Sequence, residues 1–500
     1  MKYEVVIGLE AHAQLATNTK LFCGCSTRFG APPNTHTCPV CTGHPGVLPV
    51  MNRTAFEHAV KTALALNCTV NLQTALDRKN YYYPDLPKNY QISQNYNNLG
   101  VGGHLGLEVG DQVRRVRIHN VHLEEDAGKL LHPEDILSTF FSGKAAAEQA
   151  AGAGPEAFAN LTMVDLNRAG TPLCEIVTEP DLRSTEEARV YMETLAGILQ
   201  YLGVSDCKMQ EGSLRFEASI SLRAYGAKEY GNRVEIKNLN SMKAVVHSLE
   251  YEARRQADCL DHGERIARET RLWDEGAGRT APMRSKEEAH DYRYFPEPDL
   301  VPVEIDAAWL DGVRASLPEM PWARRDRFVE ALGLPAYDAA VLAADKALAD
   351  YFEDCVRLGA EARSASHWIM GSVQRELNAR GIGVAELRVP PASLVELIRL
   401  ADGGTIAPNT GKEVFAEMAE TGRPAAEIVE GKGLRQICDA GELEAVVLGV
   451  LRENPKAAAD LRAGKKQAMG FLMGQVMRAT GGKANPKIVT GLIARKLPDL

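Results

Sequence analysis

Polar and apolar residues alternate in several short runs within residues 1–293. The clearest run is 213–223, SLRFEASISLR, in which every second side chain is apolar. Residues 233–237, RVEIK, repeat the pattern. Because successive side chains of a strand point to opposite faces, this period predicts an antiparallel sheet with one packed face and one polar face.

The segment 8–15, GLEAHAQL, follows the apolar residues 5–7 and shows the same alternation. As a strand, it places Glu10, His12 and Gln14 on one face and apolar side chains on the other. One interpretation is an ordinary strand with a polar outer face. The other is an acid–base or metal site, because carboxylate and imidazole groups are common partners there. The segment alone leaves both interpretations open.

Changes of pattern divide the rest of the chain. Apolar residues recur with helical spacing at 52–66, 185–202 and 241–260, which predicts three helices. Prolines then gather at 296–321, and residues 401–412, ADGGTIAPNTGK, form a second joint. The stretches that follow both joints are again helical in pattern. These features predict the α+β class and more than one domain.

The overall composition is that of an ordinary soluble protein, with 45% hydrophobic residues, 25% charged residues and a net charge of −9. No segment has about 18 consecutive apolar residues, and the first residues, MKYEVVIGLE, lack the pattern of a signal peptide. These features predict a cytoplasmic protein with no membrane partner. Ten cysteines in that compartment should be thiols or metal ligands rather than disulfides.

Positive charge is concentrated at the end of the chain, although the net charge argues against a uniformly basic nucleic-acid binder. Residues 461–500 contain one acid, Asp499, and eight basic residues. A basic segment in an acidic protein indicates either a nucleic-acid surface or a solvated helical face. The basic residues are Arg462, Lys465, Lys466, Arg478, Lys483, Lys487, Arg495 and Lys496.

Four cysteines have the spacing of a metal knuckle. Cys23-Gly-Cys25 is followed, after twelve intervening residues, by Cys38-Pro-Val-Cys41. Four thiolates can surround a tetrahedral Zn²⁺ and leave no open coordination position, so this zinc would be structural. The alternative is four unrelated thiols.

Acidic residues gather at 121–129, VHLEEDAGK, where three successive acids cannot all lie on one face of a strand. One interpretation is a solvated surface. With Glu10 and His12, the acids could instead form a Mg²⁺ site, which needs few carboxylates besides waters and substrate phosphates. No sequence rule brings these residues together. The candidate residues are Glu10, His12, Glu124, Glu125 and Glu211.

Familiar nucleotide-binding motifs do not occur in the sequence. There is no G-x-x-x-x-G-K-[ST] loop, and GVGGHLG at 100–106 does not fit G-x-G-x-x-G, so its glycines predict a hairpin turn. The loop 78–93, RKNYYYPDLPKNYQIS, combines tyrosines with Lys79 and Lys88. Such residues can stack on a base or sugar and pair with phosphate, or the tyrosines can fill a core.

Seven long stretches resemble one known family, the B subunits of the glutamine-dependent aspartyl/glutamyl-tRNA(Asn/Gln) amidotransferases. The resemblance covers essentially the whole chain, and its motifs are too long for chance agreement. The stretches are IGLEAHAQL, FGAPPNTHTCPVCTGHPGVLPVMN, RKNYYYPDLPKNYQISQ, HLEEDAGK, DLNRAGTPLCEIVTEPD, VEIKNLNSM and MRSKEEAHDYRYFPEPDL.

The resemblance implies three domains. Residues 1–293 would form a cradle-like, antiparallel-sheet catalytic domain with a zinc knuckle, which binds the tRNA acceptor end, ATP and Mg²⁺. Residues 294–405 would form a helical domain. Residues 406–500 would form a YqeY-like tail domain, also all-α, that holds the tRNA body through its basic residues.

The resemblance also implies a carbon–nitrogen ligase with glutamine as the amido donor. The B subunit would use ATP and Mg²⁺ to phosphorylate the side-chain carboxylate of Asp-tRNA(Asn) or Glu-tRNA(Gln). Ammonia, released from glutamine by an amidase A subunit, would arrive through a channel and displace the phosphate. A small C subunit would hold the heterotrimer together, and the cognate non-discriminating aminoacyl-tRNA synthetase is a candidate further partner.

The same resemblance assigns roles to single residues. Lys79 and Lys88 would lie near the mouth of the ammonia channel, where one of them would gate ammonia. Asn89 stands where the family pattern has a glycine, and Phe216 and Glu217 replace a Cys-Asp or similar pair. The implied Mg²⁺ ligands are Glu10, His12, Glu124 and Glu125, the further catalytic acid is Glu211, and the Zn²⁺ ligands are Cys23, Cys25, Cys38 and Cys41.

Two other functions fit parts of the sequence. A non-enzymatic tRNA-binding module would use the zinc knuckle and the basic tail, and would bind tRNA without cleaving ATP. A stand-alone metal-dependent hydrolase would use Glu10, His12 and Glu124, and would act without partner subunits. ATP cleavage that requires misacylated tRNA distinguishes the amidotransferase from both.

Overall fold

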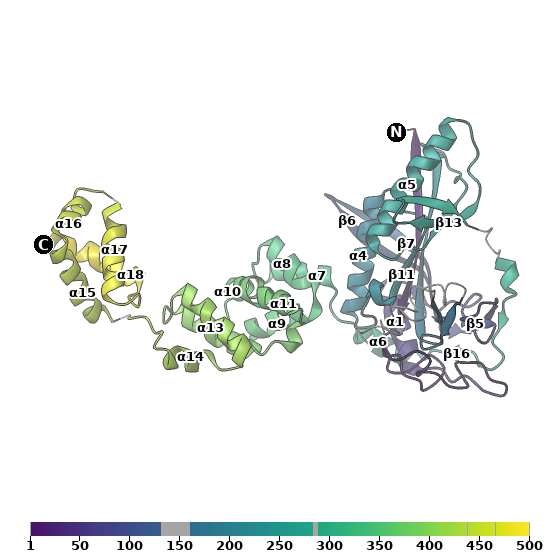
Figure 1. The fold of residues 1–500 in the computed structure, drawn as a ribbon, viewed down its shortest axis with the longest axis horizontal. Helices are drawn as coiled ribbons and strands as arrows, with labels where there is room; N and C mark the ends of the chain where they lie inside the picture. The colour runs from purple at the N-terminus through teal and green to yellow at the C-terminus, as the bar shows by residue number, and fades with distance from the viewer. Residues whose placement is uncertain (1, 132–160, 284–288, 438, 466, 500) are drawn as a thin grey trace, which may run out of the picture. The chain divides into compact units, whose positions relative to one another are not determined.

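The computed structural model describes residues 2–131, 161–283, 289–437, 439–465 and 467–499. The chain divides into two compact units, Met1–Pro318 and Glu319–Leu500. The first unit contains a large sheet with helices, and the second is built from helices (Figure 1). The predicted α+β class is confirmed.

The main sheet of the first unit has nine strands within the described residues. It is mixed, whereas the sequence predicted an antiparallel sheet, because β12 and β13 run parallel. The 20-residue helix α5 (Met242–Asp261) joins these two strands and is long enough for such a crossover. In spatial order the strands are β14 (Arg279–Pro282), β13 (Glu269–Asp274), β12 (Val234–Lys237), β11 (Leu214–Ala224), β1 (Tyr3–Gln14), β10 (Pro172–Thr178), β7 (Gln112–Glu125), β6 (Gly100–Val109) and β2 (Thr69–Val70).

Helices pack against one face of this sheet. Helix α1 (Arg53–Ala65) contacts β7, α4 (Thr185–Tyr201) contacts β6, and α5 contacts β11. Burial of the apolar half of each strand, such as Ala11 and Ala13 of β1, stabilises this arrangement. The three helices predicted at 52–66, 185–202 and 241–260 are confirmed, and the opposite face of the sheet carries the polar side chains of β1.

Short strands add smaller sheets to the first unit. The pairs and triplets are β15 (Phe295–Pro296) with β4 (Asp77–Asn80) and β5 (Tyr90–Ser93), β16 (Val303–Glu304) with β3 (Gln73–Thr74), and β8 (Lys129–Leu131) with β9 (Met163–Asp165). The antiparallel pair β4–β5 brackets the tyrosine-rich loop, so it holds Lys79 in a strand and Lys88 in the connection.

The glycine-rich run at 100–106 lies in strand β6, so the prediction of a hairpin turn is wrong. Close packing requires two of these glycines, Gly100 and Gly103. A Cβ atom on Gly103 would lie 2.4 Å from Cys68 Sγ and 2.5 Å from the carbonyl oxygen of Leu66. The strand therefore approaches the C-terminal end of α1 more closely than any side chain would allow.

A buried ionic cluster joins α5 to strands β13 and β14. Glu252 is fully buried and accepts hydrogen bonds from Arg255 at 2.9 and 2.8 Å. Arg271 lies 3.1 Å from the same carboxylate, and Thr280 donates to it. Burial disfavours the carboxylate, but these donors outweigh burial and lower the pKa of Glu252.

Replacement of Glu252 by Gln is expected to destabilise the chain by about 3 kcal/mol, because it removes the buried carboxylate that Arg255 and Arg271 share and leaves only Glu269 to offset their charges. The carboxylate contributes stability above its unfolded pKa, near 4.3, and loses it as the pH falls through the lower folded value. The free energy of unfolding, measured with urea, should therefore differ fully between the variant and wild type at pH 7, and this difference should become smaller below about pH 4. The exposed Glu250→Gln on the same helix serves as the control, and an equal effect of both variants would contradict the account.

The second unit has two hydrophobic cores within the described residues. The first core is built from α7 (Pro321–Glu330), α8 (Ala336–Ala344), α9 (Lys346–Arg357), α10 (Ala362–Trp368), α11 (Gln374–Arg380), α12 (Pro391–Asp402), α13 (Pro408–Thr421) and α14 (Ala425–Gly431). The second is built from α15 (Ala440–Glu453), α16 (Pro455–Arg462), α17 (Gln467–Ala479) and α18 (Pro486–Lys496). The domain boundaries predicted after residues 293 and 405 stay predictions. No helix among the described residues is long and apolar enough to cross a membrane.

Candidate functional site

The uncovered face of the sheet carries the predicted polar residues of β1. Glu10, His12 and Gln14 are half-buried on this face, whereas the residues between them are buried. Strand β1 lies between β11 and β10, and the pairing places His12 opposite Arg215 on one side and Glu175 on the other. Side chains from three separate parts of the sequence are thereby brought into one row.

Glu175 connects two histidines in this row. Its Oε2 atom lies 3.4 Å from His12 Nε2 and 3.1 Å from His122 Nε2. The second histidine is on β7, whose pairing with β10 sets it opposite Glu175. Its other ring nitrogen, Nδ1, lies 3.0 Å from Asn120 Oδ1. The carboxylate is therefore held from both sides by imidazole rings.

The charges of this row depend on one another. Burial disfavours the imidazolium form of His12, but Glu175 outweighs burial and raises the pKa of His12 to about 9. The same contacts raise the pKa of His122 and lower the pKa of Glu175 well below its usual range. A metal ion that binds His12 must therefore displace a proton.

Glu124 completes a group of candidate metal ligands. One ligand atom each from His12, Glu124 and Glu175 lies within 4.8 Å of the others. Glu124 is 2% exposed, and its Oε2 atom has no hydrogen-bond partner among the described residues. A buried carboxylate oxygen without a donor is costly unless a cation is near. Two carboxylates and one imidazole thus fit a divalent cation, which would take its other ligands from water or substrate.

A cavity of about 970 Å³ is lined by two of these residues, His12 and Glu124. Lys79 lines it, with Nζ 5.9 Å from the ring centre of Tyr81 and 5.3 Å from that of Tyr292. Burial disfavours its charge, but nearby Glu124 outweighs this and raises the pKa of Lys79. A cavity of this size can hold a large ligand, and its wall carries as many Asp and Glu as Lys and Arg residues, so it offers partners for both a cation and an anion. Its basic lining residues are Arg28, Lys79, Lys129, Arg168, Arg215 and Lys237.

Asp126 anchors two of these basic residues rather than joining the ligand group. It accepts two hydrogen bonds of 3.0 Å from Arg215 and one of 2.8 Å from Gln14. Burial disfavours its charge, but Arg215 and Arg168 outweigh burial and lower the pKa of Asp126 to about 2. This carboxylate therefore fixes the guanidinium of Arg215 at the wall of the cavity.

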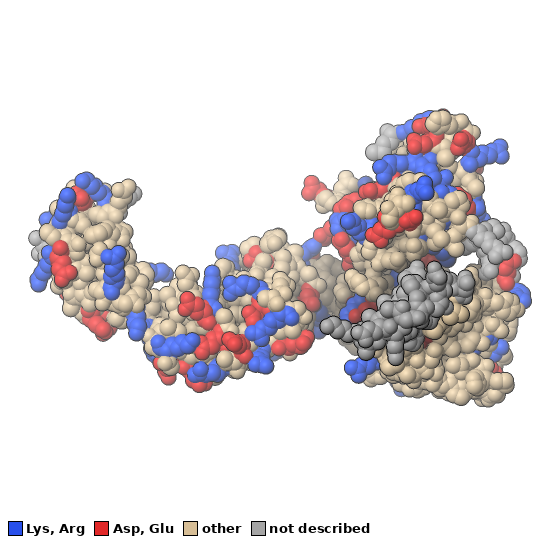
Figure 2. Space-filling view, in the orientation of Figure 1, with Lys and Arg blue, Asp and Glu red and all other residues tan. Residues whose placement is uncertain are grey.

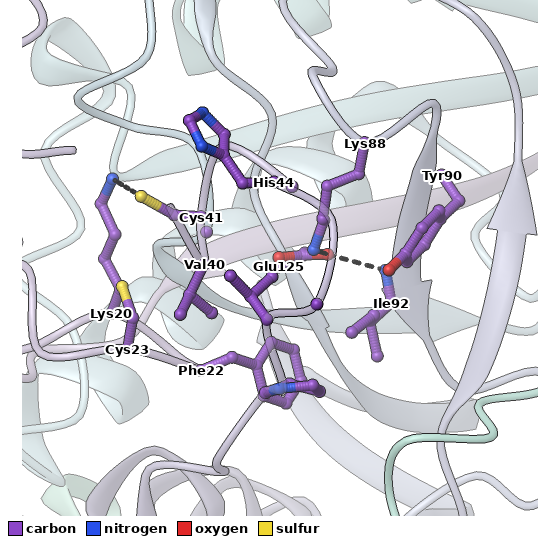
Figure 3. Close-up of a pocket in the computed structure, with 15 residues that line it drawn as sticks. Lys20, Phe22, Cys23, Val40, Cys41, His44, Lys88, Tyr90, Ile92 and Glu125 are labelled. Carbon is purple, nitrogen blue, oxygen red and sulfur yellow. Dashed lines mark hydrogen bonds and ion pairs between the residues drawn. The ribbon is translucent and has the colours of Figure 1, made fainter. Parts of the chain in front are cut away.

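Glu125 points away from Glu124, because consecutive strand residues face opposite sides. It lies in a second cavity of about 200 Å³, where it pairs with Lys88 and accepts a 3.0 Å hydrogen bond from the backbone of Ile92. Figure 3 shows the Lys88 side chain directed at this carboxylate. Asn89, beside Lys88, has the positive φ of 62° that a glycine would adopt without strain.

The predicted ligand residues are thus only partly brought together. His12 and Glu124 meet, whereas Glu10 and Glu125 lie outside the group of three ligand atoms. Glu211 lies at the wall of the large cavity, 3.1 Å from Lys208. Reasoning from sequence missed Glu175, although a lone acid within the apolar strand PLCEIVT was a signal that could have found it.

The four knuckle cysteines form a second candidate metal centre. Their sulfur atoms all lie within 4.8 Å of one another, and Cys38 Sγ is 3.9 Å from Cys41 Sγ. Zn–S bonds of about 2.3 Å in a tetrahedron place the sulfurs about 3.8 Å apart, so the cluster fits Zn²⁺. The hydrogen bond between Cys23 and Cys41 lowers the pKa of Cys41 to about 4 and raises that of Cys23, and burial raises the pKa of Cys25 to about 11, so a metal ion that binds the cluster must displace protons.

Comparison with known proteins finds matches along the whole chain. Residues 5–311 match the family described as GatB/GatE catalytic domain, and residues 350–497 match the family described as GatB domain. Several curated relatives are named as the B subunit of aspartyl/glutamyl-tRNA(Asn/Gln) amidotransferase. The one from Carboxydothermus hydrogenoformans is 51% identical over 499 residues and covers 100% of both chains. Those from Moorella thermoacetica and Brevibacillus brevis are 52% and 49% identical over 497 and 499 residues, covering 99% and 100% of this chain and 100% of each relative.

Proposed function

Since the chain belongs to the family of aspartyl/glutamyl-tRNA(Asn/Gln) amidotransferase B subunits, we propose that it activates the side-chain carboxylate of misacylated tRNA within such an enzyme. Membership of the family confirms the resemblance inferred from the motifs. The proposed reaction converts Asp-tRNA(Asn), Glu-tRNA(Gln) or both to the amide, with glutamine as the amido donor. The proposed setting is the cytoplasm.

One observation carries the proposal for the active site. His12, Glu124 and Glu175 present their ligand atoms together, and His12 and Glu124 line the large cavity, whose wall also carries Lys and Arg side chains. Phosphoryl transfer needs this combination, because ATP and the attacking carboxylate are both anions that must be brought into contact. We propose that this group, rather than a familiar phosphate-binding loop, holds Mg²⁺. The prediction from sequence that Glu10 and Glu125 are also ligands stays a prediction.

The chain's own residues would position the two anionic substrates. The side-chain carboxylate of the aminoacyl group attacks the γ-phosphorus of ATP, ADP leaves, and ammonia then displaces phosphate to give the amide. Bound Mg²⁺ would neutralise negative charge on the phosphates. Lys79 and the anchored Arg215 supply fixed positive charges at the cavity wall. Because these charges are already in place, little reorganisation is needed when the transition state forms.

The small cavity is proposed as part of the route for ammonia. Gln91, at the wall of the large cavity, donates a 2.7 Å hydrogen bond to the backbone carbonyl of Glu125, which lines the small cavity. The two spaces are therefore separated by a thin wall. The buried Lys88–Glu125 pair lies at that wall and is the candidate gate.

Replacement of Lys88 by Met is expected to separate the two half-reactions. Glutamine-dependent amide formation should fall at least about tenfold, because removal of Lys88 leaves Glu125 charged and buried in the ammonia route. ATP cleavage with misacylated tRNA should persist, since Lys88 does not line the large cavity. Both rates are measured in the reconstituted enzyme, with Lys61→Met, on α1, as the control. An equal loss of both activities would contradict the assignment.

The C-terminal helices are proposed to contact the tRNA body. Figure 2 shows Lys and Arg side chains on the surface of α15–α18. Lys466 belongs to the same basic segment but lies outside the described residues. Within residues 461–500, the exposed basic residues that the structure describes are Arg462, Lys465, Arg478, Lys483, Lys487 and Arg495. The proposed protein partners are an amidase A subunit and a small C subunit, with the cognate non-discriminating synthetase as a further candidate.

The decisive experiment measures ATP cleavage by the chain reconstituted with its A and C subunits, glutamine and Mg²⁺. It compares misacylated tRNA with the correctly charged tRNA. Cleavage that requires misacylated tRNA and accompanies Asn-tRNA or Gln-tRNA formation would establish the proposed reaction. Cleavage without regard to tRNA would favour a hydrolase, and tight tRNA binding without cleavage would favour a binding module.

A further inference from the structure

Lys20 carries a positive charge into the interior beside the cysteine knuckle. The residue is 1% exposed. Its Nζ atom donates hydrogen bonds of 2.7 Å to the carbonyl oxygen of His36 and 3.2 Å to that of Leu166, and lies 3.5 Å from Cys41 Sγ. Figure 3 shows the contact between Lys20 and Cys41. All three donor positions of the ammonium group are thereby used.

The partners of Lys20 leave the cysteine cluster as the source of negative charge. Two of the three acceptors are neutral carbonyl groups. Among the described residues, no ion pair joins Lys20 to a carboxylate. A dication held by four thiolates carries a net charge of −2, and a buried ammonium group in contact with one sulfur offsets part of it. Four neutral thiols would leave the ammonium without an anion in direct contact, because Glu125, which lines the same small cavity, is paired with Lys88.

Lys20 also connects the knuckle to the turn at residues 166–170. The carbonyl of Leu166 begins this turn and also accepts a 3.1 Å bond from the backbone of Ala169. The backbone amide of Gly170 then donates a 2.8 Å hydrogen bond to the carbonyl oxygen of Asp126. The backbone amide of Asp126 in turn donates a 2.8 Å hydrogen bond to the carbonyl oxygen of Thr171. The turn is therefore the connection between the knuckle and the end of β7, next to the proposed active site.

We propose that Lys20 is a positioning residue: it compensates the thiolate charge of the zinc-bound knuckle and ties the knuckle to the turn at 166–170. This role goes beyond the proposed reaction, because it concerns zinc affinity and the order of the turn. Groups that hydrogen-bond to metal ligands commonly change metal affinity by about 10- to 100-fold.

The test uses the full chain and three variants, Lys20→Met, Lys20→Arg and the control Lys61→Met. Zinc affinity is measured by competition with a chromophoric chelator. Hydrogen exchange is measured by mass spectrometry on the peptide that covers the turn, with zinc in excess. Lys20→Met is expected to weaken zinc binding about 10- to 100-fold and to speed exchange in the turn about tenfold or more. Lys61→Met should change neither quantity.

Comparison of the two Lys20 variants separates charge from packing. If Lys20 only fills space, the apolar Met variant should be tolerated better than the larger Arg variant. The proposal requires the opposite order, with Arg keeping zinc affinity closer to wild type even if the Met variant fails to fold. Unchanged zinc affinity in Lys20→Met would overturn charge compensation, and unchanged exchange in the turn would overturn the connection to the active site.

Discussion

Replacement of Glu124 by Gln is expected to reduce tRNA-dependent ATP cleavage by about 1,000-fold in the reconstituted enzyme. A bound metal ion contributes several kcal/mol to charge neutralisation during phosphoryl transfer, and about 4 kcal/mol corresponds to this factor. The amide removes one of the two carboxylates that meet at His12. Because Glu124 Oε2 has no partner among the described residues, the substitution breaks no hydrogen bond of that atom, and Glu175 remains to offset part of the charge of Lys79, so the fold should stay intact.

Binding of Mn²⁺, followed by electron paramagnetic resonance, provides the matched measurement. Glu124→Gln should weaken Mn²⁺ binding at least about tenfold, because one carboxylate ligand becomes neutral. The neighbouring Glu125→Gln should leave this affinity unchanged, since Glu125 faces the small cavity. Loss of Mn²⁺ binding in both variants would instead support the ligand set inferred from sequence. Full ATP cleavage by Glu124→Gln would exclude the proposed site.

Replacement of Cys38 and Cys41 by Ser is expected to remove bound zinc and to lower the midpoint of thermal unfolding by at least about 10 °C. Metal binding contributes directly to the stability of such knuckles, because the ligands are not assembled in the unfolded chain. The backbone also connects the knuckle to the turn at 166–170. The amide of Leu21 donates a 2.9 Å hydrogen bond to the carbonyl oxygen of Gly170, and the neighbouring amide of Lys20 donates a 2.9 Å hydrogen bond to that of Cys25, within the knuckle. Loss of the zinc should therefore destabilise the turn at 166–170 as well as the knuckle.

Zinc content by atomic emission and the unfolding midpoint by differential scanning fluorimetry test this expectation. Cys259→Ser provides the control, because Cys259 lies outside the cluster of four sulfurs. It should keep both the zinc and the midpoint of wild type. A doubly substituted chain that retained the wild-type midpoint would show that the cysteine cluster does not stabilise the fold.

Local patterns in the sequence determined the elements and one of the two candidate metal centres. The alternation of residues 8–15 and 213–223 predicted β1 and β11, and helical spacing predicted α1, α4 and α5. The spacing of the four cysteines was sufficient to predict their cluster. All of these features depend on residues that are near one another in the chain, where side-chain direction repeats with a fixed period.

Only the tertiary structure decided which acidic residues meet. Glu175 lies beside His12 because β10 pairs with β1, although more than 160 positions separate the two residues in the sequence. The pairing of β10 with β7 likewise places Glu124 beside the other candidate ligands and Glu125 on the opposite face. The glycine-rich run of 100–106 also lies in a strand instead of a turn, with Gly100 and Gly103 packed closely against α1 and Cys68. Sheet register is set by which apolar faces pack together across the whole unit, and no local sequence pattern contains that information.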